Sequence, residues 1–380
     1  MFGFTVFLIA NIPSIKQFLP ESFLVNIGFA GVLFFCGFSR RVIKNDFTLR
    51  LSANMKLFLF LLLLFVLYGQ ISVFFPFQYM DDYVFLQSMK YLYIIVVSAL
   101  ILFFAEKQDM KVFAVFQALW GVFVAVASIA GIWEYSDTQH YCTVAAPIGA
   151  AIIMFLSYAV FAKSQLKGFL LTSPFIILLL LALFLLPSRG GPLFAGFAFL
   201  VIILIDIFYT NPFSRRVLKT GFYLLIGLLV LYFYQNHSSP RQAYRMHRLF
   251  AEIGTEQRIP LLLDTVHKII DNPMGYGMGS SVRIVGFYPH NMFLESMLEF
   301  GILPTLVFFL VVIVYPIRLF VLAIKTKDQL LLSISVLILY LFLIFSVSYS
   351  AAHMYIYFSV VSLALSHQNI VSLHKMEGKI

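Results

Sequence analysis

Apolar runs long enough to cross a bilayer recur along the whole chain, and they exclude an ordinary soluble fold. Most have roughly the 17–25 residues that a helix needs to cross the hydrocarbon layer. Only 11% of the residues are charged, against about a quarter in soluble domains. The sequence predicts an all-α polytopic membrane protein of about twelve transmembrane helices. The expected spans are 2–18, 22–38, 56–75, 86–104, 112–133, 147–163, 169–187, 191–209, 221–235, 297–317, 329–348 and 351–366.

Basic residues fall in every second connection between these runs, as at Arg40 and Arg41 or Arg215 and Arg216. Lysine and arginine enrichment marks the cytoplasmic side of a membrane protein. These connections and both chain ends are therefore expected to be cytoplasmic. The net charge of +9 is then explained by topology, and nucleic-acid binding is not expected.

One long extramembrane stretch, at about 235–296, is expected on the opposite side of the membrane. Within it, residues 253–270 have apolar side chains spaced three and four apart, which predicts an amphipathic helix on the membrane or the bundle. Three arginines at helical spacing precede that helix and would share one face: Arg241, Arg245 and Arg248. The expected organisation is a single integral membrane domain, 1–380, with this large outer loop.

A glycine-rich string, Asp271-Asn-Pro-Met-Gly-Tyr-Gly-Met-Gly279, follows the predicted amphipathic helix. Its glycines would let the backbone approach a ligand closely. The same composition is typical of a flexible connector. The sequence leaves both interpretations open.

His290 and Asn291 stand immediately before an apolar run that begins near Phe293. An imidazole titrates near neutral pH and is suited to proton transfer at a bilayer surface. Either residue could instead cap the following helix. Glu295 and Glu299 fall on the first turns of that helix, where carboxylates suit the helix dipole and could orient an imidazole.

Arg189 lies on the same outer side, in the short hairpin 187–192. An isolated arginine there can reach lipid phosphates, whereas its planar guanidinium beside Ser188 and two glycines also suits phosphate recognition. Asp81 and Asp82 are adjacent acids without a histidine or cysteine nearby in sequence, which favours a solvated turn over a metal site. No metal and no other cofactor is expected.

These motifs together resemble the O-antigen ligase and O-antigen polymerase superfamily. The resemblance rests on their order, spacing and shared membrane side: Ser188-Arg189-Gly190, Arg258 in the outer loop, Asn272-Pro-x-Gly-x-Gly-x-Gly279, and His290-Asn291 followed by Gly301. Pro304 departs from the family pattern, which usually has a small or hydroxyl residue there, and leaves the local helix geometry open.

The resemblance implies a C-type membrane glycosyltransferase in the bacterial inner membrane, with its active site facing the periplasm. Its donor would be a glycan on undecaprenyl diphosphate. Arg189 and Arg258 would hold the diphosphate, and His290 would be the general base or position the acceptor. Further support is expected from Asn291 and Glu295 and from the arginines at positions 241, 245 and 248.

The resemblance favours a polysaccharide polymerase, which extends a lipid-linked acceptor repeat by an inverting, metal-independent transfer. A chain-length regulator is an expected partner, besides membrane lipids. The closest alternative is a ligase that transfers the glycan to a lipid A core. A lipid-linked oligosaccharide flippase is a further alternative, but a transporter would place ionisable residues along a mid-membrane pathway.

Overall fold

A computed structural model of the protein describes residues 1–15, 23–46, 51–74, 81–132, 141–161, 165–186, 190–209, 227–228, 232, 236, 258–286, 289, 291–347 and 351–376. Within these ranges the regular structure is helical and contains no strand. Eight of the described helices are long and apolar enough to cross a membrane. The predicted all-α polytopic membrane fold is confirmed.

The chain forms two compact units, each described separately. Unit 1 comprises Met1–Phe113, Gln257–Val321 and Phe345–Ile380, and unit 2 comprises Ala114–Glu256 and Leu322–Ile344. Unit 1 contains the glycine-rich turn and the helix that follows Asn291.

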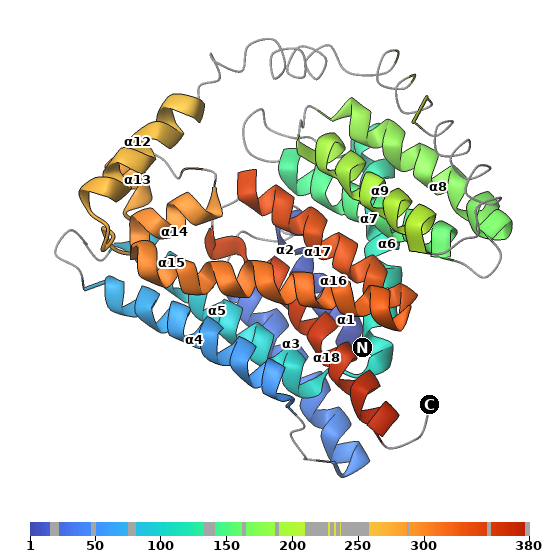
Figure 1. Ribbon diagram of the computed structural model, residues 1–380, viewed down its shortest axis with the longest axis horizontal. Coiled ribbons are helices and arrows are strands. Elements are labelled where there is room, and N and C mark those ends of the chain that lie inside the picture. The colour runs from blue at the N-terminus through green and yellow to red at the C-terminus, as the bar shows by residue number, and fades with distance from the viewer. Residues whose placement is uncertain are drawn as a thin grey trace. The chain divides into compact units, whose positions relative to one another are not determined.

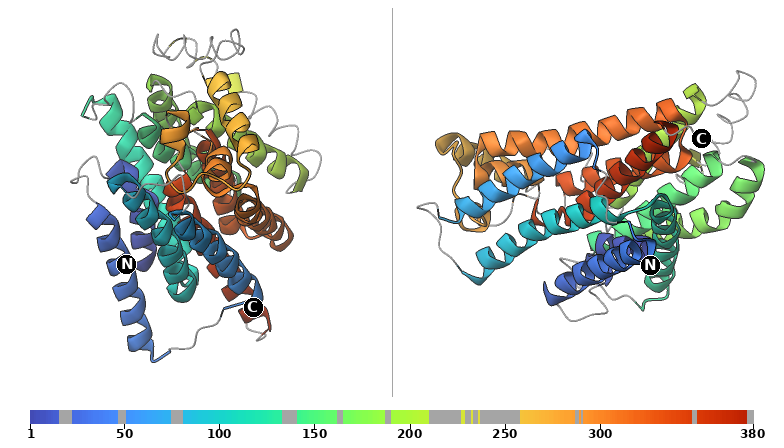
Figure 2. Two further views of the ribbon diagram at one scale, coloured as in Figure 1. Left: turned by 90° about the vertical axis from the view of Figure 1, so that its left-hand side faces the viewer. Right: turned by 90° about the horizontal axis from the view of Figure 1, so that it is seen from below.

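Unit 1 is built from long apolar helices with shorter helices at one end (Figure 1). The long helices pack through neighbouring pairs such as α4 with α5 and α5 with α18, and α15 runs alongside α4 in both Figure 1 and Figure 2. The N-terminal and long helices are α1 (Phe2–Ala10), α2 (Ile12–Ile15), α3 (Phe23–Lys44), α4 (Ala53–Ser72), α5 (Asp82–Phe104), the start of α6 (Lys107–Ile129), α15 (Ile302–Phe309), the start of α16 (Tyr315–Thr326) and α18 (Tyr355–Met376). The shorter ones are α12 (Arg258–Asp271), α13 (Ser281–Val285), α14 (Met292–Phe300) and the 3₁₀ turn η4 (Ala351–His353).

An aromatic cluster joins these helices in the core of unit 1. The Phe65 ring of α4 stacks on Phe308 of α15 at 4.5 Å between centroids and meets Phe300 of α14 edge-on at 5.4 Å. Tyr91 of α5 meets Phe300 edge-on at 5.3 Å. Such pairs add about 0.5–1.5 kcal/mol each beyond their buried area. The cluster fixes α14 beside α4, α5 and α15.

Unit 2 centres on α7 (Tyr141–Phe161), which packs against α8 (Gln165–Leu185) and α9 (Gly190–Tyr209). Helix α17 (Gln329–Val347) approaches α7 where Gly149 leaves room for the Tyr340 hydroxyl, which donates to the Ala145 carbonyl oxygen at 3.2 Å. A Cβ at position 149 would lie only 2.0 Å from that hydroxyl oxygen. Small residues on α7 therefore permit close helix packing, as is common in membrane bundles.

Several predicted spans differ from the observed helices, among them 351–366, which is divided into η4 and α18. The first, at 2–18, is broken at Asn11 into α1 and α2, and Asn11 donates its side-chain amide to the Phe7 carbonyl oxygen at 3.0 Å. The prediction of a span at 297–317 was wrong about the first residue. Gly301 interrupts the helix, and the candidate span runs from Ile302 to Thr326. The span predicted at 221–235 lies mostly outside the described residues.

A polar cluster joins three helices at the end of unit 1 that contains the α3 C-terminus. The Asp109 carboxylate of α6 accepts hydrogen bonds from both guanidinium NH groups of Arg40, at 2.6 and 3.1 Å. It also accepts from the backbone N–H groups of Gly3, at 3.1 Å, and Glu106, at 2.8 Å. One buried carboxylate therefore fastens α1, α3 and the start of α6 together.

Candidate functional site

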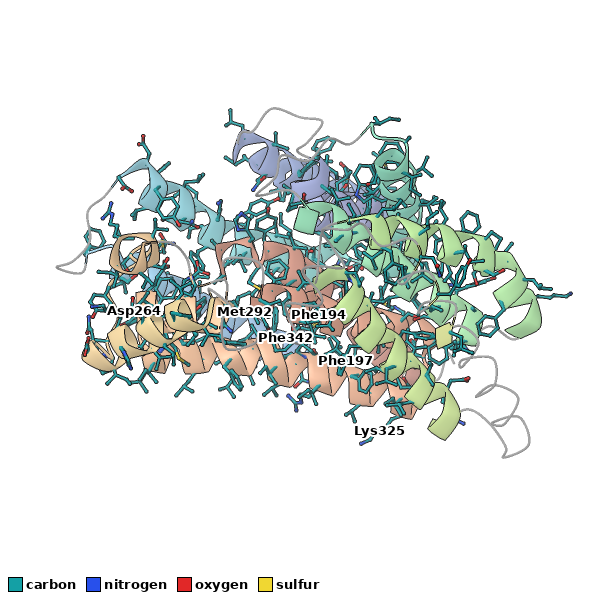
Figure 3. All side chains as sticks on the ribbon, turned by 90° about the horizontal axis from the view of Figure 1, so that it is seen from above. Phe194, Phe197, Asp264, Met292, Lys325 and Phe342 are labelled. Atoms are coloured by element: carbon teal, nitrogen blue, oxygen red, sulfur yellow. The ribbon has the colours of Figure 1, made fainter. Side chains whose placement is uncertain are left out.

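The candidate site is built around the N-terminus of α14. Asn291 has an extended backbone, and its side-chain oxygen accepts hydrogen bonds from the N–H groups of Phe293 at 3.0 Å and Leu294 at 3.1 Å. These contacts make Asn291 the N-cap of α14. The capping interpretation of Asn291 is thus confirmed, and residue 290 immediately precedes a capped helix. Met292, labelled in Figure 3, is fully buried just inside this helix.

Glu295 connects the first turn of α14 to η4. Its side chain is 2% exposed, and Oε2 accepts a hydrogen bond from the Ala351 backbone N–H at 2.8 Å. A carboxylate can satisfy a donor at the start of a helical turn, where backbone N–H groups lack intrahelical partners. Glu295 therefore positions η4 relative to α14.

Glu299 connects the other end of α14 to the glycine-rich turn. Its Oε1 accepts from the Ser281 hydroxyl at 2.8 Å and from the Ser281 backbone N–H at 3.4 Å, and the Gly279 N–H also donates to the carboxylate. Burial raises the pKa of Glu299 to about 7, although these three donors act in the opposite direction. Glu299 therefore holds residues 279–281 against α14.

The glycine-rich turn packs closely against the C-terminal end of α14. Tyr276 and Gly277 donate their N–H groups to the carbonyl oxygens of Leu298 and Glu299, at 2.9 and 2.8 Å. Gly275 has a φ of 88°, and a Cβ there would lie 2.5 Å from the Gly301 nitrogen. The glycines thus permit close backbone packing, so the turn is an ordered part of the scaffold.

Gly301 ends α14 and allows α15 to begin at once. It has a φ of 85°, and a Cβ there would lie 2.6 Å from the Met274 carbonyl. The next N–H, of Ile302, donates to the Pro273 oxygen at 3.0 Å. Pro304 falls in the first turn of α15, where a missing N–H costs no intrahelical hydrogen bond. The departure from the family pattern at this position is therefore accommodated.

Asp81 acts as a helix cap. Its Oδ1 accepts from the Val84 N–H at 2.9 Å, and Oδ2 forms a salt bridge with Arg283. The hydrogen bond from Val84 is the main reason that the pKa of Asp81 lies below its usual value, and Arg283 adds to the effect. Within the described ranges no three histidine, cysteine or acidic side chains lie close enough together to hold a metal ion.

An apolar groove of about 340 Å³ lies beside the glycine-rich turn in unit 1. Helices α4 and α15 form its walls, and its lining is apolar except for the Tyr68 hydroxyl. The lining residues are Leu64, Phe65, Tyr68, Pro273, Met274, Phe300, Leu303, Pro304 and Val307. The groove is suited to a hydrocarbon chain.

The predicted amphipathic helix is observed as α12, which begins at Arg258. Thr265 and Ile269 are buried, whereas Leu263 and Ile270 are exposed apolar residues, and Asp264 (Figure 3) is exposed as well. For Arg258 the structure describes the backbone and not the side chain. The other predicted site residues that lie outside the described ranges are Arg189, Arg241, Arg245, Arg248 and His290.

The structure also brings together two ionisable residues that the motifs did not single out. Lys90 Nζ of α5 lies 3.4 Å from His353 Nε2 of η4. Lys90 is the only charged residue between Tyr83 and Phe104. A single charged residue in an apolar span often marks a functional position, so the sequence alone could have drawn attention to Lys90. Their pairing, across 263 positions, was not predictable from local sequence.

Comparison with known proteins identifies the part of the chain that carries the motifs. Residues 174–309 match the family model described as O-antigen ligase. This segment is an O-antigen ligase family domain. It contains Arg189, Arg258, the glycine-rich turn, His290 and Gly301. The resemblance drawn from the motifs is confirmed, while a search of curated proteins found no significant match.

The O-antigen ligase family is a glycosyltransferase-type enzyme family, so the expectation of an enzyme in this class is confirmed. The match favours a transferase over the flippase alternative. The family domain runs from within α8 to the end of α15, whereas Lys90 and His353 lie outside it.

Proposed function

We propose that this protein is a polysaccharide polymerase of the bacterial inner membrane. It transfers a glycan from undecaprenyl diphosphate to a lipid-linked acceptor repeat at the periplasmic face. The order of the motifs within the O-antigen ligase family domain supports this proposal. So does the sequence Tyr288-Pro-His-Asn-x-Phe-Leu-Glu with the later Glu-Phe-Gly301, which resembles polymerases more than ligases.

The proposed reaction is an inverting substitution at C1 of the donor sugar. The acceptor hydroxyl oxygen bonds to C1 while the C1–O bond to the diphosphate breaks, and the diphosphate leaves with the bonding electrons. His290 takes the hydroxyl proton. Arg189 and Arg258 neutralise the charge that develops on the diphosphate. These roles need no divalent cation.

The observation that carries the proposal is the support given to α14, whose N-terminus directly follows His290. Asn291 caps the helix, Glu295 ties its first turn to η4, and Glu299 ties its last turn to Ser281. Catalytic groups need to be held within about 0.5 Å of their working geometry. A helix fastened at both ends is suited to hold a general base in this way.

The ligase alternative is favoured by one observation, the description of the matching family model as O-antigen ligase. The two reactions share a donor and differ in acceptor. An assay that varies the acceptor distinguishes the two. Purified protein in nanodiscs is given lipid-linked repeat units, with or without a lipid A core, in the presence of EDTA. Longer lipid-linked glycans without the core support a polymerase, whereas products formed only on the core would establish a ligase.

Substitution of His290 tests the proposed chemistry. His290→Ala should lower the transfer rate by about 10²- to 10⁴-fold, the usual effect of losing a general base. His290→Gln should be similarly impaired, because glutamine can hydrogen-bond the acceptor but cannot take its proton. Substantial polymer from the glutamine variant would reduce His290 to a positioning role. Loss of wild-type activity in EDTA would contradict metal independence.

Substitution of the two arginines tests the diphosphate site. Arg189→Lys and Arg258→Lys should fail almost as badly as the alanine variants, because lysine keeps the charge and loses the bidentate fork. Glycan length is scored on a gel at matched protein levels. Normal length with both lysine variants would contradict the proposed role.

A further inference from the structure

Helix α12 presents an apolar stripe on its exposed surface. Leu263 and Ile270 are more than half exposed, Val266 is about a third exposed, and Met274, shortly beyond the helix, is more than half exposed. The three side chains on the helix fall within about 60° of one another around its axis, because they are spaced three and four positions apart. Contiguous exposed apolar side chains outside a membrane span mark a surface that contacts a partner or lipid.

The other sides of α12 differ from this stripe. Thr265 and Ile269 are buried, and α12 packs against α13 and α14. Asp264, labelled in Figure 3, is exposed together with His267 and Asp271, and these three occupy a sector about 60° wide next to the apolar stripe. The helix therefore has one side towards the protein, one exposed apolar side and one exposed polar side. A helix of this kind is suited to a position between protein, lipid and water.

The C-terminal end of α12 lies at the level where membrane spans end. The glycine-rich turn follows α12, and its Met278 N–H donates to the Ser72 hydroxyl oxygen at 3.2 Å. Ser72 is the last residue of one candidate span, and Ile302 is the first residue of another. The Ile302 N–H donates to the Pro273 oxygen at 3.0 Å. Because two span ends hold the turn, α12 ends near the boundary of the hydrocarbon layer.

The apolar stripe also continues into a surface that faces lipid. Met274 and Leu303 line the same groove. Leu303 is 72% exposed and lies in the first turn of a candidate span, where exposed apolar side chains meet the bilayer. Helix α12 runs at an angle to α15 (Figure 1). Its 14 residues give it a length of about 21 Å, too short to cross a hydrocarbon layer about 30 Å thick.

We propose that α12 lies in the membrane–water interface, with Leu263, Val266 and Ile270 inserted among the lipid acyl chains and its polar side in water. This inference does not depend on the reaction proposed above. Interfacial helices are buried by about 5–10 Å at the boundary between headgroups and acyl chains. The helix contains two basic and two acidic residues, so apolar contact, and not attraction to anionic lipid, provides its binding.

This placement gives α12 a part in setting the depth of the candidate site. Arg258 is the first residue of the helix, so its backbone lies in the same interfacial layer as the rest of α12. A substrate anchored by a prenyl chain holds its diphosphate in that layer. If the proposed reaction is correct, α12 therefore keeps Arg258 at the depth of the group that it is proposed to bind.

Fluorescence quenching from two sides tests the inference. In a chain whose native Cys36 and Cys142 are replaced by serine, Leu263→Cys and Ile270→Cys each introduce one cysteine that is labelled with bimane. The full-length protein is placed in phosphatidylcholine nanodiscs containing a lipid with a nitroxide near the top of its acyl chain. Aqueous iodide is the second quencher. Asp264→Cys is the matched control, because Asp264 is exposed on the polar side of the same helix.

The lipid nitroxide should quench the labels at positions 263 and 270 severalfold more strongly than the label at position 264, because only the first two lie among acyl chains. A label introduced by Leu303→Cys, on the span itself, gives the reference for full lipid contact. Iodide should quench in the opposite order, most strongly at position 264. Neither measurement depends on glycan transfer.

Equal lipid quenching at positions 263, 264 and 270 would overturn the inference, and so would iodide quenching at 263 and 270 as strong as that at 264. Protection of positions 263 and 270 from both quenchers would place them against protein, either a second copy or another segment of the chain, and would overturn it as well. Monodisperse gel filtration identifies folded variants. Should Leu263→Cys not fold, Val266→Cys takes its place with the same expected order.

Discussion

At the scale of single residues, the most informative side chains around α14 accept hydrogen bonds from backbone N–H groups. Asn291 caps the helix, and Glu295 and Glu299 bind N–H groups of η4 and of the glycine-rich turn. The sequence suggested that the two glutamates could orient an imidazole. The observed contacts give them a clear structural role, which leaves the proposed proton transfer to His290.

Glu299 should make stability depend on pH. Its pKa rises from an ordinary 4.5 to about 7 because of burial. Between these values the folded protein keeps a proton that the unfolded chain releases, so stability is fully present below pH 4.5 and is lost as pH rises through 7. The unfolding temperature of wild type should fall between pH 5 and 7.5 by roughly 3 °C more than that of Glu299→Gln. Equal falls would contradict the raised pKa.

Gly301 should not tolerate a side chain. Gly301→Ala combines a φ of 85° with a Cβ 2.6 Å from the Met274 carbonyl, so it should cost at least about 2 kcal/mol and reduce the yield of folded protein. Gly28→Ala is the matched control, because nothing lies within 4 Å of its added Cβ. It should be neutral or stabilising by about 0.5–1 kcal/mol. Fluorescence-detected gel filtration and thermal melts compare the two, and equal behaviour would show that the close packing is dispensable.

At the scale of elements, the sequence identified most helices and missed the contacts that end or join them. Hydrophobic runs predicted the long helices because membrane insertion depends mainly on local composition. The interruption at Gly301 depends on Pro273 and Met274, which lie 27 or more positions earlier. The pairing of Lys90 with His353 likewise depends on tertiary packing, so neither feature has a complete local signal.

The Asp109 cluster should be a main point of attachment between α1, α3 and α6. Asp109→Asn would leave Arg40, whose side chain is 18% exposed, without its closest carboxylate, and should cost about 3 kcal/mol. Asp46→Asn breaks a more exposed pair with Arg41 and should cost only about 0–1 kcal/mol. Thermal unfolding in detergent compares the two variants. A similar small loss in both would show that the buried pair is energetically unimportant.

At the scale of the whole molecule, composition and helix length were sufficient to establish a multi-pass membrane protein. The orientation is a separate prediction that rests on the distribution of lysine and arginine. It decides whether the proposed transfer takes place at the outer face. The motif residues Arg189 and His290 are expected on that face, because the connections that contain them alternate with the basic connections that are expected to be cytoplasmic.

Cysteine labelling tests this orientation directly. In a chain whose native Cys36 and Cys142 are replaced by serine, a cysteine at Ser188 or Ser238 should react with an impermeant thiol reagent added outside intact cells. One at Ser214, beside Arg215 and Arg216, should react only after the membrane is opened, because basic connections stay cytoplasmic. Reaction at position 214 alone in intact cells would invert the topology. His290 would then face the cytoplasm, and a polymerase acting at the periplasmic face would be excluded.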